Sequence, residues 1–119
     1  NEDFTGFIEY ASPDRWKAFQ VLPIENANKE SAKAFLINEK DFKRFVQNNS
    51  RVRCPLVPET NSDMIDSYVM IDPQGRLYSN TGSRHSFSNP IYEHSLKKAL
   101  KEGGFIMEKF LSRGGSYAW

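Results

Sequence analysis

The stretch DRWKAFQVLPIE, residues 14–25, alternates like a β-strand but begins with two cations. Arg15 and Lys17 are two residues apart, so on a strand both side chains point to the same side of the sheet. Neither face of the stretch is uniformly polar, because Phe19 shares the face of the two cations. Two mixed faces are typical of a parallel α/β sheet that is covered on both sides. The pattern therefore predicts a core strand at residues 15–24.

Two interpretations fit the cation pair. Arg15 and Lys17 could be solvated charges on an edge strand, and for the pair taken alone this is the commoner situation. They could instead point into a cavity and hold a polyphosphate, since an arginine can fork onto phosphate oxygens and a lysine adds a point charge.

Length and composition limit what the chain can be. Its 119 residues suffice for one modest domain but not for a complete eightfold β/α barrel, which needs about 250 residues. The net charge is only +1, so phosphate binding must come from a local cluster, and we expect no direct contact with nucleic acid. The single cysteine, Cys54, excludes an internal disulfide and cannot hold a zinc or iron–sulfur site. It fits a reducing compartment, and we expect a cytoplasmic location, with any targeting signal upstream of Asn1.

The first half of the chain has three further local signals. Helical periodicity covers residues 2–12 and stops at Pro13. Asn38 is a good N-cap for a second helix, with Asp41 three residues further on. The two prolines between residues 52 and 60 indicate an extended segment that cannot be a well-paired central strand.

The clearest local signal is SYVMIDPQGRLYSN. Two β-rich runs flank a turn with proline at i+1 and glycine at i+3, which predicts a β-hairpin at about residues 68–79. We expect a loop at residues 81–90. Helices should follow at about residues 91–112, with Pro90 near the first helical position.

One long strand and a hairpin make a poor independent sheet, because stability usually needs three or more mutually supporting strands. The order helix, strand, helix, hairpin, helix, helix therefore indicates the closing part of a larger α/β fold. We expect a single domain over residues 1–119, of class α/β, or α+β as an isolated piece.

The tail at residues 113–119 is a candidate anion site. Gly114 and Gly115 would let the backbone approach a ligand, beside the charge of Arg113. The simpler explanation is a flexible terminal loop.

Tyr68 is a candidate donor. A phenol can give a proton or a hydrogen atom if it lines a cavity, although packing at the entrance of a strand is the simpler explanation. Nearby, Glu59 and Asp63 are interpreted as loop carboxylates, with no spacing that demands acid–base work.

Four blocks of the sequence resemble the C-terminal portion of the viperin family, in the same order and spacing. The blocks are PDRWKAFQVLPIEN, INEKDFKRFVQ, CPLVPETNSDMIDSYVMID and FLSRGGSYAW. Viperins are radical S-adenosylmethionine (SAM) enzymes, so the resemblance implies the last strand of a partial β/α (TIM-like) barrel at about residues 15–24.

The resemblance also implies an activity for the complete protein. In viperins a [4Fe–4S] cluster, held by a Cys-x-x-x-Cys-x-x-Cys motif, cleaves SAM, and the resulting radical takes the 4′ hydrogen of a nucleoside triphosphate, CTP in the animal enzyme. Loss of the 3′ hydroxyl as water and a one-electron reduction give the 3′-deoxy-3′,4′-didehydro nucleotide, which terminates viral RNA chains in antiviral defence.

Five residues match functional positions of the family. Arg15 and Lys17 match cations that bind the triphosphate, and Arg113 and Gly114 match a tail that closes over the substrate. Tyr68 matches the tyrosine proposed to donate a proton or hydrogen, and is thus the implied catalytic residue. The cluster motif is absent, so this chain should be inactive alone and should need the cluster-bearing N-terminal part of the same protein.

A different class of function stays open on the residues alone. The chain could be an autonomous, non-catalytic α+β module that binds a nucleotide or a protein. In either case its exposed sheet edges could pair with a second copy.

Overall fold

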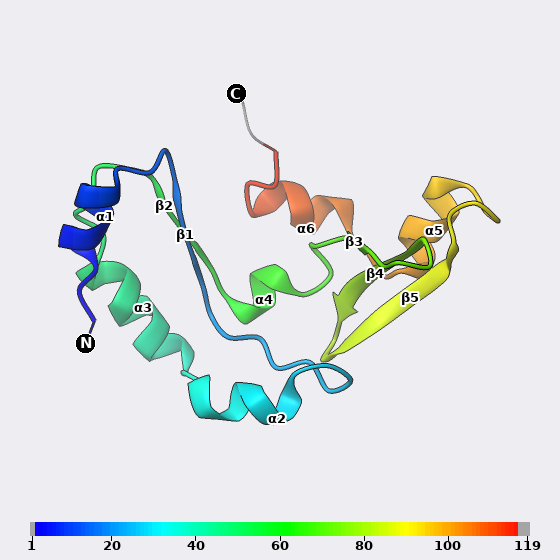
Figure 1. Cartoon of the computed structure of the whole chain (residues 1–119), viewed down its shortest axis with the longest axis horizontal. Helices are drawn as coiled ribbons and strands as arrows, with labels where there is room; N and C mark the ends of the chain where they lie inside the picture. The colour runs from blue at the N-terminus through cyan, green and yellow to red at the C-terminus, as the bar shows by residue number, and fades with distance from the viewer. Residues whose placement is uncertain (1, 117–119) are drawn as a thin grey trace.

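The computed structural model describes residues 2–116 as short helices and strands in an open arrangement (Figure 1). The strands form two separate sheets, a parallel pair β1–β2 and an antiparallel sheet in the order β3–β4–β5. The isolated chain is therefore α+β. The elements are α1 Thr5–Ala11, β1 Trp16–Phe19, α2 Lys29–Ala32, η1 Lys33–Phe35, α3 Glu39–Asn48, β2 Leu56–Glu59, α4 Asn61–Met64, β3 Met70–Ile71, β4 Arg76–Thr81, β5 Arg84–Pro90, α5 Leu96–Glu102 and α6 Met107–Ser112.

Helices α1 and α3 lie against one face of the parallel sheet (Figure 1). Trp16 of β1 packs edge-on against Phe4 and Phe45, with ring centroids 6.3 and 6.0 Å apart. Because side chains alternate along a strand, Lys17 lies on the opposite face. Buried apolar residues of these elements are Ile8, Ala18 and Phe42.

The ends of α1 and α3 are joined by Asn49, whose side chain is fully buried. Its Oδ1 accepts from the Phe4 backbone N–H at 2.7 Å, and its Nδ2 donates to the carbonyls of Glu2 and Phe45. A buried amide with every bond made fixes the mutual position of the two helices, and with them the helix-covered face of β1. At the other end of α3, Asn38 caps Asp41 as the sequence predicts, with a 2.8 Å bond.

β2 confirms the expectation for the proline-bearing segment, which is extended and is not a central strand among the described residues. Its residues pair in parallel with β1, with Lys17 opposite Val57 and Phe19 opposite Glu59. Pro58 is tolerated because, among the described strands, β2 pairs on one side only, and the ladder does not need the missing N–H. The proline therefore marks an edge strand and does not exclude a paired one.

β1 is shorter than the predicted strand at residues 15–24. The Gln20 backbone still donates to the Glu59 carbonyl at 3.0 Å, but β2 ends there and α4 begins at Asn61. No strand in the described part of the chain runs beside the residues after Gln20, so the ladder stops.

A hairpin is present where the turn signal predicted one. β3 and β4 pair in antiparallel fashion, and the Gly75 N–H donates to the Asp72 carbonyl at 2.9 Å. Gly75 has a φ of +74°, a conformation that glycine adopts without steric cost.

The prediction of a loop at residues 81–90 is wrong, because most of these residues form β5. Gly82, with a φ of +62°, and Ser83 make a two-residue connection between β4 and β5. This is the turn length and the glycine position of a tight hairpin, which sequence reasoning overlooked.

The helices expected at about residues 91–112 begin later than predicted. Pro90 ends β5 rather than opening a helix, and α5 starts after Ser95, whose side chain accepts from the Lys98 N–H. α5 covers one face of the antiparallel sheet, where Leu77 and Ala99 are buried. The two helices expected there are present as the short helices α5 and α6.

The described chain is not compact. Its radius of gyration is 16.5 Å, whereas a folded domain of this length has about 13.5 Å. Large apolar side chains such as Phe7, Phe19 and Phe35 are exposed. Both observations fit a chain that supplies part of a larger core. Among residues 2–116, no helix combines the length and the apolar character needed to cross a membrane.

Candidate functional site

The carboxylate of Glu59 is the buried centre of the candidate site, with 1% of its side chain exposed. Glu59 is the last residue of β2, and α4 follows at once. Thr60 and Asp63 exchange hydrogen bonds in a capping box, which fixes the direction in which the chain leaves the strand. The carboxyl ends of strands are where open α/β sheets place ligand sites.

Lys17 reaches Glu59 from the neighbouring strand. Its Nζ lies 2.7 Å from Glu59 Oε1, and 26% of its side chain is exposed. Lys17 is opposite Val57 in the parallel register, so it shares a face with Glu59, two residues further along. The alternation of side chains along the strand predicted that Lys17 could face a cavity. In the structure the same alternation directs Lys17 to the buried carboxylate of Glu59.

Tyr68 approaches the other oxygen of the same carboxylate. Its hydroxyl donates to Glu59 Oε2 at 2.6 Å. Burial raises the pKa of Tyr68, and the hydrogen bond and negative charge of Glu59 raise it further. The positive charges of Arg113 and Lys17 lower the pKa but do not outweigh these effects.

Arg113 closes the cluster from the end of α6. Its Nη1 lies 3.4 Å from both oxygens of Glu59, and its Nη2 donates to the Ser67 carbonyl at 3.0 Å. The guanidinium carbon lies 3.8 Å from the centroid of the Tyr68 ring, a cation–π contact. Only 6% of the Arg113 side chain is exposed, and its Nε is buried with no hydrogen-bond partner among the described residues.

Gly114 and Gly115 have a local structural role that places Arg113. Gly114 has a φ of +75°, and its N–H donates to the Leu111 carbonyl, while the Gly115 N–H donates to the Phe110 carbonyl. This is a Schellman cap of α6, with Arg113 as the last residue before the left-handed glycine. The glycine pair thus ends the helix at the point where Arg113 turns toward Glu59.

The structure therefore brings three of the five predicted residues together, on Glu59. Arg15 is exposed and lies one residue before β1. Gly114 is exposed and adjoins the cluster through Arg113. The last part of the expected tail, residues 117–119, lies outside the described residues.

Sequence reasoning missed Glu59, which it interpreted as a loop carboxylate. The overlooked signal was its position directly before a Thr-x-x-Asp capping box, at the end of an extended segment. Had that segment been assigned as a strand parallel to residues 16–19, Glu59 would have stood on the face of Lys17.

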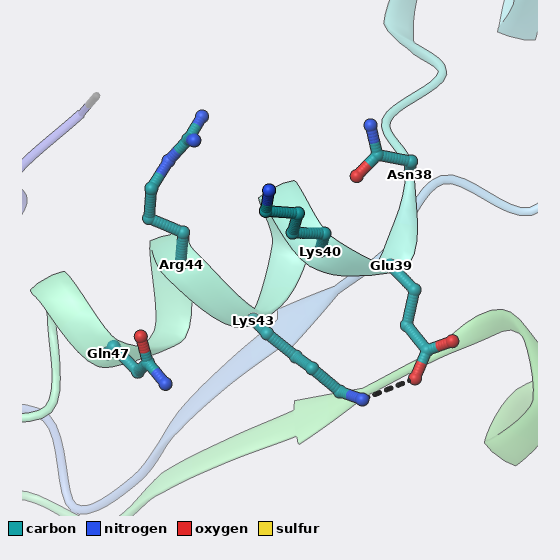
Figure 2. A pocket seen from close by; sticks show the side chains of 6 residues that line it. All are labelled: Asn38, Glu39, Lys40, Lys43, Arg44 and Gln47. Carbon is teal, nitrogen blue, oxygen red and sulfur yellow. Dashed lines mark ion pairs between the residues drawn. The ribbon is translucent and has the colours of Figure 1, made fainter.

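A hollow of about 820 Å³ over α3 is a separate feature, lined by polar and charged side chains of that helix (Figure 2). Figure 2 shows Lys40 and Arg44 pointing away from Lys43, which pairs with Glu39 at 2.6 Å. Because these side chains spread outward from one helix and do not converge, we interpret the hollow as a solvated helix surface.

The residues of this chain do not fit an iron–sulfur cluster. Cys54 is the one cysteine of the sequence. Among residues 2–116 there is no group of three or more His, Cys, Asp or Glu side chains that could hold a metal ion. Ligands for such a cluster would have to come from another segment.

No protein-family model matches the chain. Several individual proteins do match it. The chain is 41% identical over 119 residues to an S-adenosylmethionine-dependent nucleotide dehydratase of Flammeovirga pacifica, covering 100% of this chain and 41% of that protein. It is 40% identical over 118 residues to a protein of the same name from Lacinutrix mariniflava, covering 99% of this chain and 25% of that protein.

An animal protein matches over nearly the whole chain too. The S-adenosylmethionine-dependent nucleotide dehydratase of Danio rerio is 38% identical over 123 residues, which cover 99% of this chain and 34% of that protein. The chain thus spans less than half the length of each of these relatives.

Proposed function

Because the chain belongs to the viperin-like S-adenosylmethionine-dependent nucleotide dehydratases and matches their C-terminal part, we propose that the complete protein is a lyase-type enzyme that dehydrates a nucleoside triphosphate. The substrate is CTP or another nucleoside triphosphate, and the product is its 3′-deoxy-3′,4′-didehydro form, made for antiviral defence. This chain contributes the triphosphate grip and a hydrogen donor.

The convergence of Lys17, Arg113 and Tyr68 on one buried carboxylate supports this proposal. Two positive charges meet one negative charge there, so the cluster keeps an excess of +1 for an anion. Arg113 has a buried Nε–H without a partner among the described residues, a donor that a phosphate oxygen could satisfy. We propose that Arg15, which is exposed and lies one residue before β1, adds a third cation for the triphosphate.

The partial β/α barrel belongs to this proposal. β1 and β2 supply two adjacent parallel strands with helices on one face, and the remainder of the protein supplies the other strands. SAM and a [4Fe–4S] cluster, bound by that remainder, would generate the radical. The residues of this chain bind the triphosphate, orient it and hold the Tyr68 hydroxyl.

The first experiment tests the grip in the complete protein. Lys17→Ala should weaken binding of CTP and of inorganic tripolyphosphate by about 1–3 kcal/mol, the range for hydrogen bonds to charged groups. Calorimetry measures both affinities. Lys43→Ala is the matched control, because Lys43 also pairs with a glutamate but lies on α3. Equal affinity in wild type and Lys17→Ala would contradict the proposed grip and would favour the other interpretation, a solvated charge on a strand edge.

The second experiment tests the donor. Tyr68→Phe removes only the hydroxyl, so it should leave nucleotide affinity near the wild-type value and slow the chemical step in single-turnover assays. A variant that loses affinity but reacts at the normal rate once saturated would assign Tyr68 to binding instead.

A further inference from the structure

The proposed grip contains an electrostatic conflict. A triphosphate site needs cations, whereas a hydrogen donor needs its phenol to keep its proton. Cations close to a phenol favour the phenolate, which has no hydrogen to give. Here Arg113 lies over the Tyr68 ring at 3.8 Å, and Lys17 reaches the same carboxylate as the Tyr68 hydroxyl.

We propose that Glu59 is the positioning residue that resolves this conflict, holding the protonated hydroxyl of Tyr68 beside the two cations of the grip. This inference rests on the proposed function of the site. Glu59 does not need to touch the nucleotide: it acts through the three side chains that it binds.

The geometry supports a positioning role in three ways. The two carboxylate oxygens are divided, with Oε1 at 2.7 Å from Lys17 Nζ and Oε2 accepting from the Tyr68 hydroxyl at 2.6 Å. Arg113 approaches both oxygens from a third direction. Burial of Glu59 at the end of a paired strand, followed by a capped helix, leaves the carboxylate little freedom to move.

Among residues 2–116, the charged groups that act on Tyr68 all belong to this cluster. They are Glu59 from β2, Lys17 from β1 and Arg113 after α6. Glu59 opposes the two cations, and burial of the phenol acts in the same direction as Glu59. Removing the carboxylate charge would leave burial alone to oppose the effect of the two cations on Tyr68.

Glu59→Gln tests the inference, because it removes the charge and keeps the size of the side chain. The complete protein is labelled with tyrosine carrying ¹³C at Cζ, and the Tyr68 resonance is assigned by its loss in Tyr68→Phe. We expect the midpoint of Tyr68 ionisation to move to lower pH in Glu59→Gln. Glu39→Gln is the matched control, since Glu39 also pairs with a lysine but lies on α3, and it should leave the midpoint unchanged.

Catalysis supplies the second readout. In Glu59→Gln we expect kcat to fall by about tenfold or more, with a smaller change in KM, and the alkaline limb of the kcat–pH profile to move to lower pH. A merely structural glutamate would reduce the amount of folded protein but would not move this profile. Unchanged Tyr68 ionisation, or wild-type kcat in a folded Glu59→Gln protein, would overturn the inference.

If Glu59→Gln folds poorly, the inference can still be tested in a variant that keeps the net charge of the cluster. Lys17→Met with Glu59→Gln removes one charge of each sign, so the cluster keeps its excess of +1. The midpoint of Tyr68 in this double variant should lie below that in Lys17→Met alone, and equal midpoints would contradict the inference.

The two failures are distinguishable. If wild type binds no tripolyphosphate, the proposed function fails whatever Tyr68 does. If wild type binds and reacts while Glu59→Gln does both with normal constants, only the role of Glu59 fails.

Discussion

At the scale of single residues, the site depends on a buried ion cluster rather than on a surface pair. Glu59 and Arg113 are almost fully buried, so each needs the opposite charge of the other. Removing one partner of a buried pair typically costs about 3–5 kcal/mol, because the remaining charge stays desolvated. Lys17 and Arg113 are therefore held in place by Glu59, which would reduce the ordering cost of the nucleotide binding that we propose.

Tyr68 gives a prediction about pH. Its pKa in the folded protein lies above the ordinary value of 10.0, chiefly through burial and then through Glu59. A group whose pKa is raised by folding stabilises the protein below its unfolded pKa and loses that contribution as pH rises through the folded value. The Tyr68 contribution should thus be complete below pH 10 and disappear above it.

Tyrosine-Cζ NMR on the wild-type protein measures this directly. The signal that is absent in Tyr68→Phe should titrate with a midpoint above 10. Tyr10→Phe is the control, because Tyr10 is 90% exposed and far from the cluster in sequence. A midpoint for Tyr68 below 10 would mean that the two cations outweigh Glu59 and burial.

At the scale of elements, the end of α6 controls where Arg113 points. The Schellman cap turns the chain directly after Arg113, and the two glycines serve it differently. Gly114 needs the left-handed conformation but has open space around it. At Gly115 an added Cβ would clash with the Phe110 carbonyl oxygen, so a side chain there displaces the backbone of the helix end.

Substitution of these glycines should separate the two roles. Gly114→Ala should cost about 1–2 kcal/mol of stability, the penalty of a left-handed alanine, with a small effect on tripolyphosphate affinity. Gly115→Ala should disturb the cap itself and lower that affinity more strongly. Thermal unfolding and calorimetry measure the two effects in the complete protein.

Gly6→Ala is the control for this pair. Gly6 lies inside α1 with nothing within 4 Å of an added Cβ, so alanine should stabilise the helix by up to about 1 kcal/mol and leave affinity unchanged. If Gly115→Ala bound as tightly as Gly6→Ala, the cap would have no influence on Arg113.

At the scale of the whole molecule, the described chain is open and exposes much of its apolar surface. Two parallel strands and a separate three-stranded sheet leave sheet edges without partners among residues 2–116. Unpaired edges and exposed aromatic side chains favour association with another chain. In the complete protein, we propose that the preceding segment covers these surfaces and brings the radical chemistry to the Glu59 cluster.

The 119-residue chain expressed alone should therefore show no nucleotide turnover with SAM and a reductant, and should elute from a size-exclusion column as more than a monomer. The complete polypeptide, assayed in parallel, should be active. Turnover by the isolated chain would show that the cluster ligands are not in a preceding segment, and a stable monomer would show that the exposed edges are protected.

Local patterns predicted much of the fold. The Asn38 cap, the first helix and the hairpin turn were found because each depends on neighbours within a few residues. β5 was not found, because Ser86 and Ser88 have weak strand signals. Ser86 pairs with Ser79 of β4 and donates to the Glu102 carbonyl of α5, and Ser88 accepts from the Leu77 N–H. The extent of β1 likewise depended on where its partner ends.

The candidate site also has one part that the sequence predicted and another that it did not. The sequence by itself determined that Lys17 lies on the face of β1 opposite Trp16, and that two glycines follow Arg113, but not that these glycines cap a helix. Only the tertiary structure decided that both cations meet Glu59 and Tyr68, since these contacts join residues 9 to 54 positions apart. The physical reason is that a buried carboxylate can be recognised as functional only once its counter-charges are known, and those come from other elements.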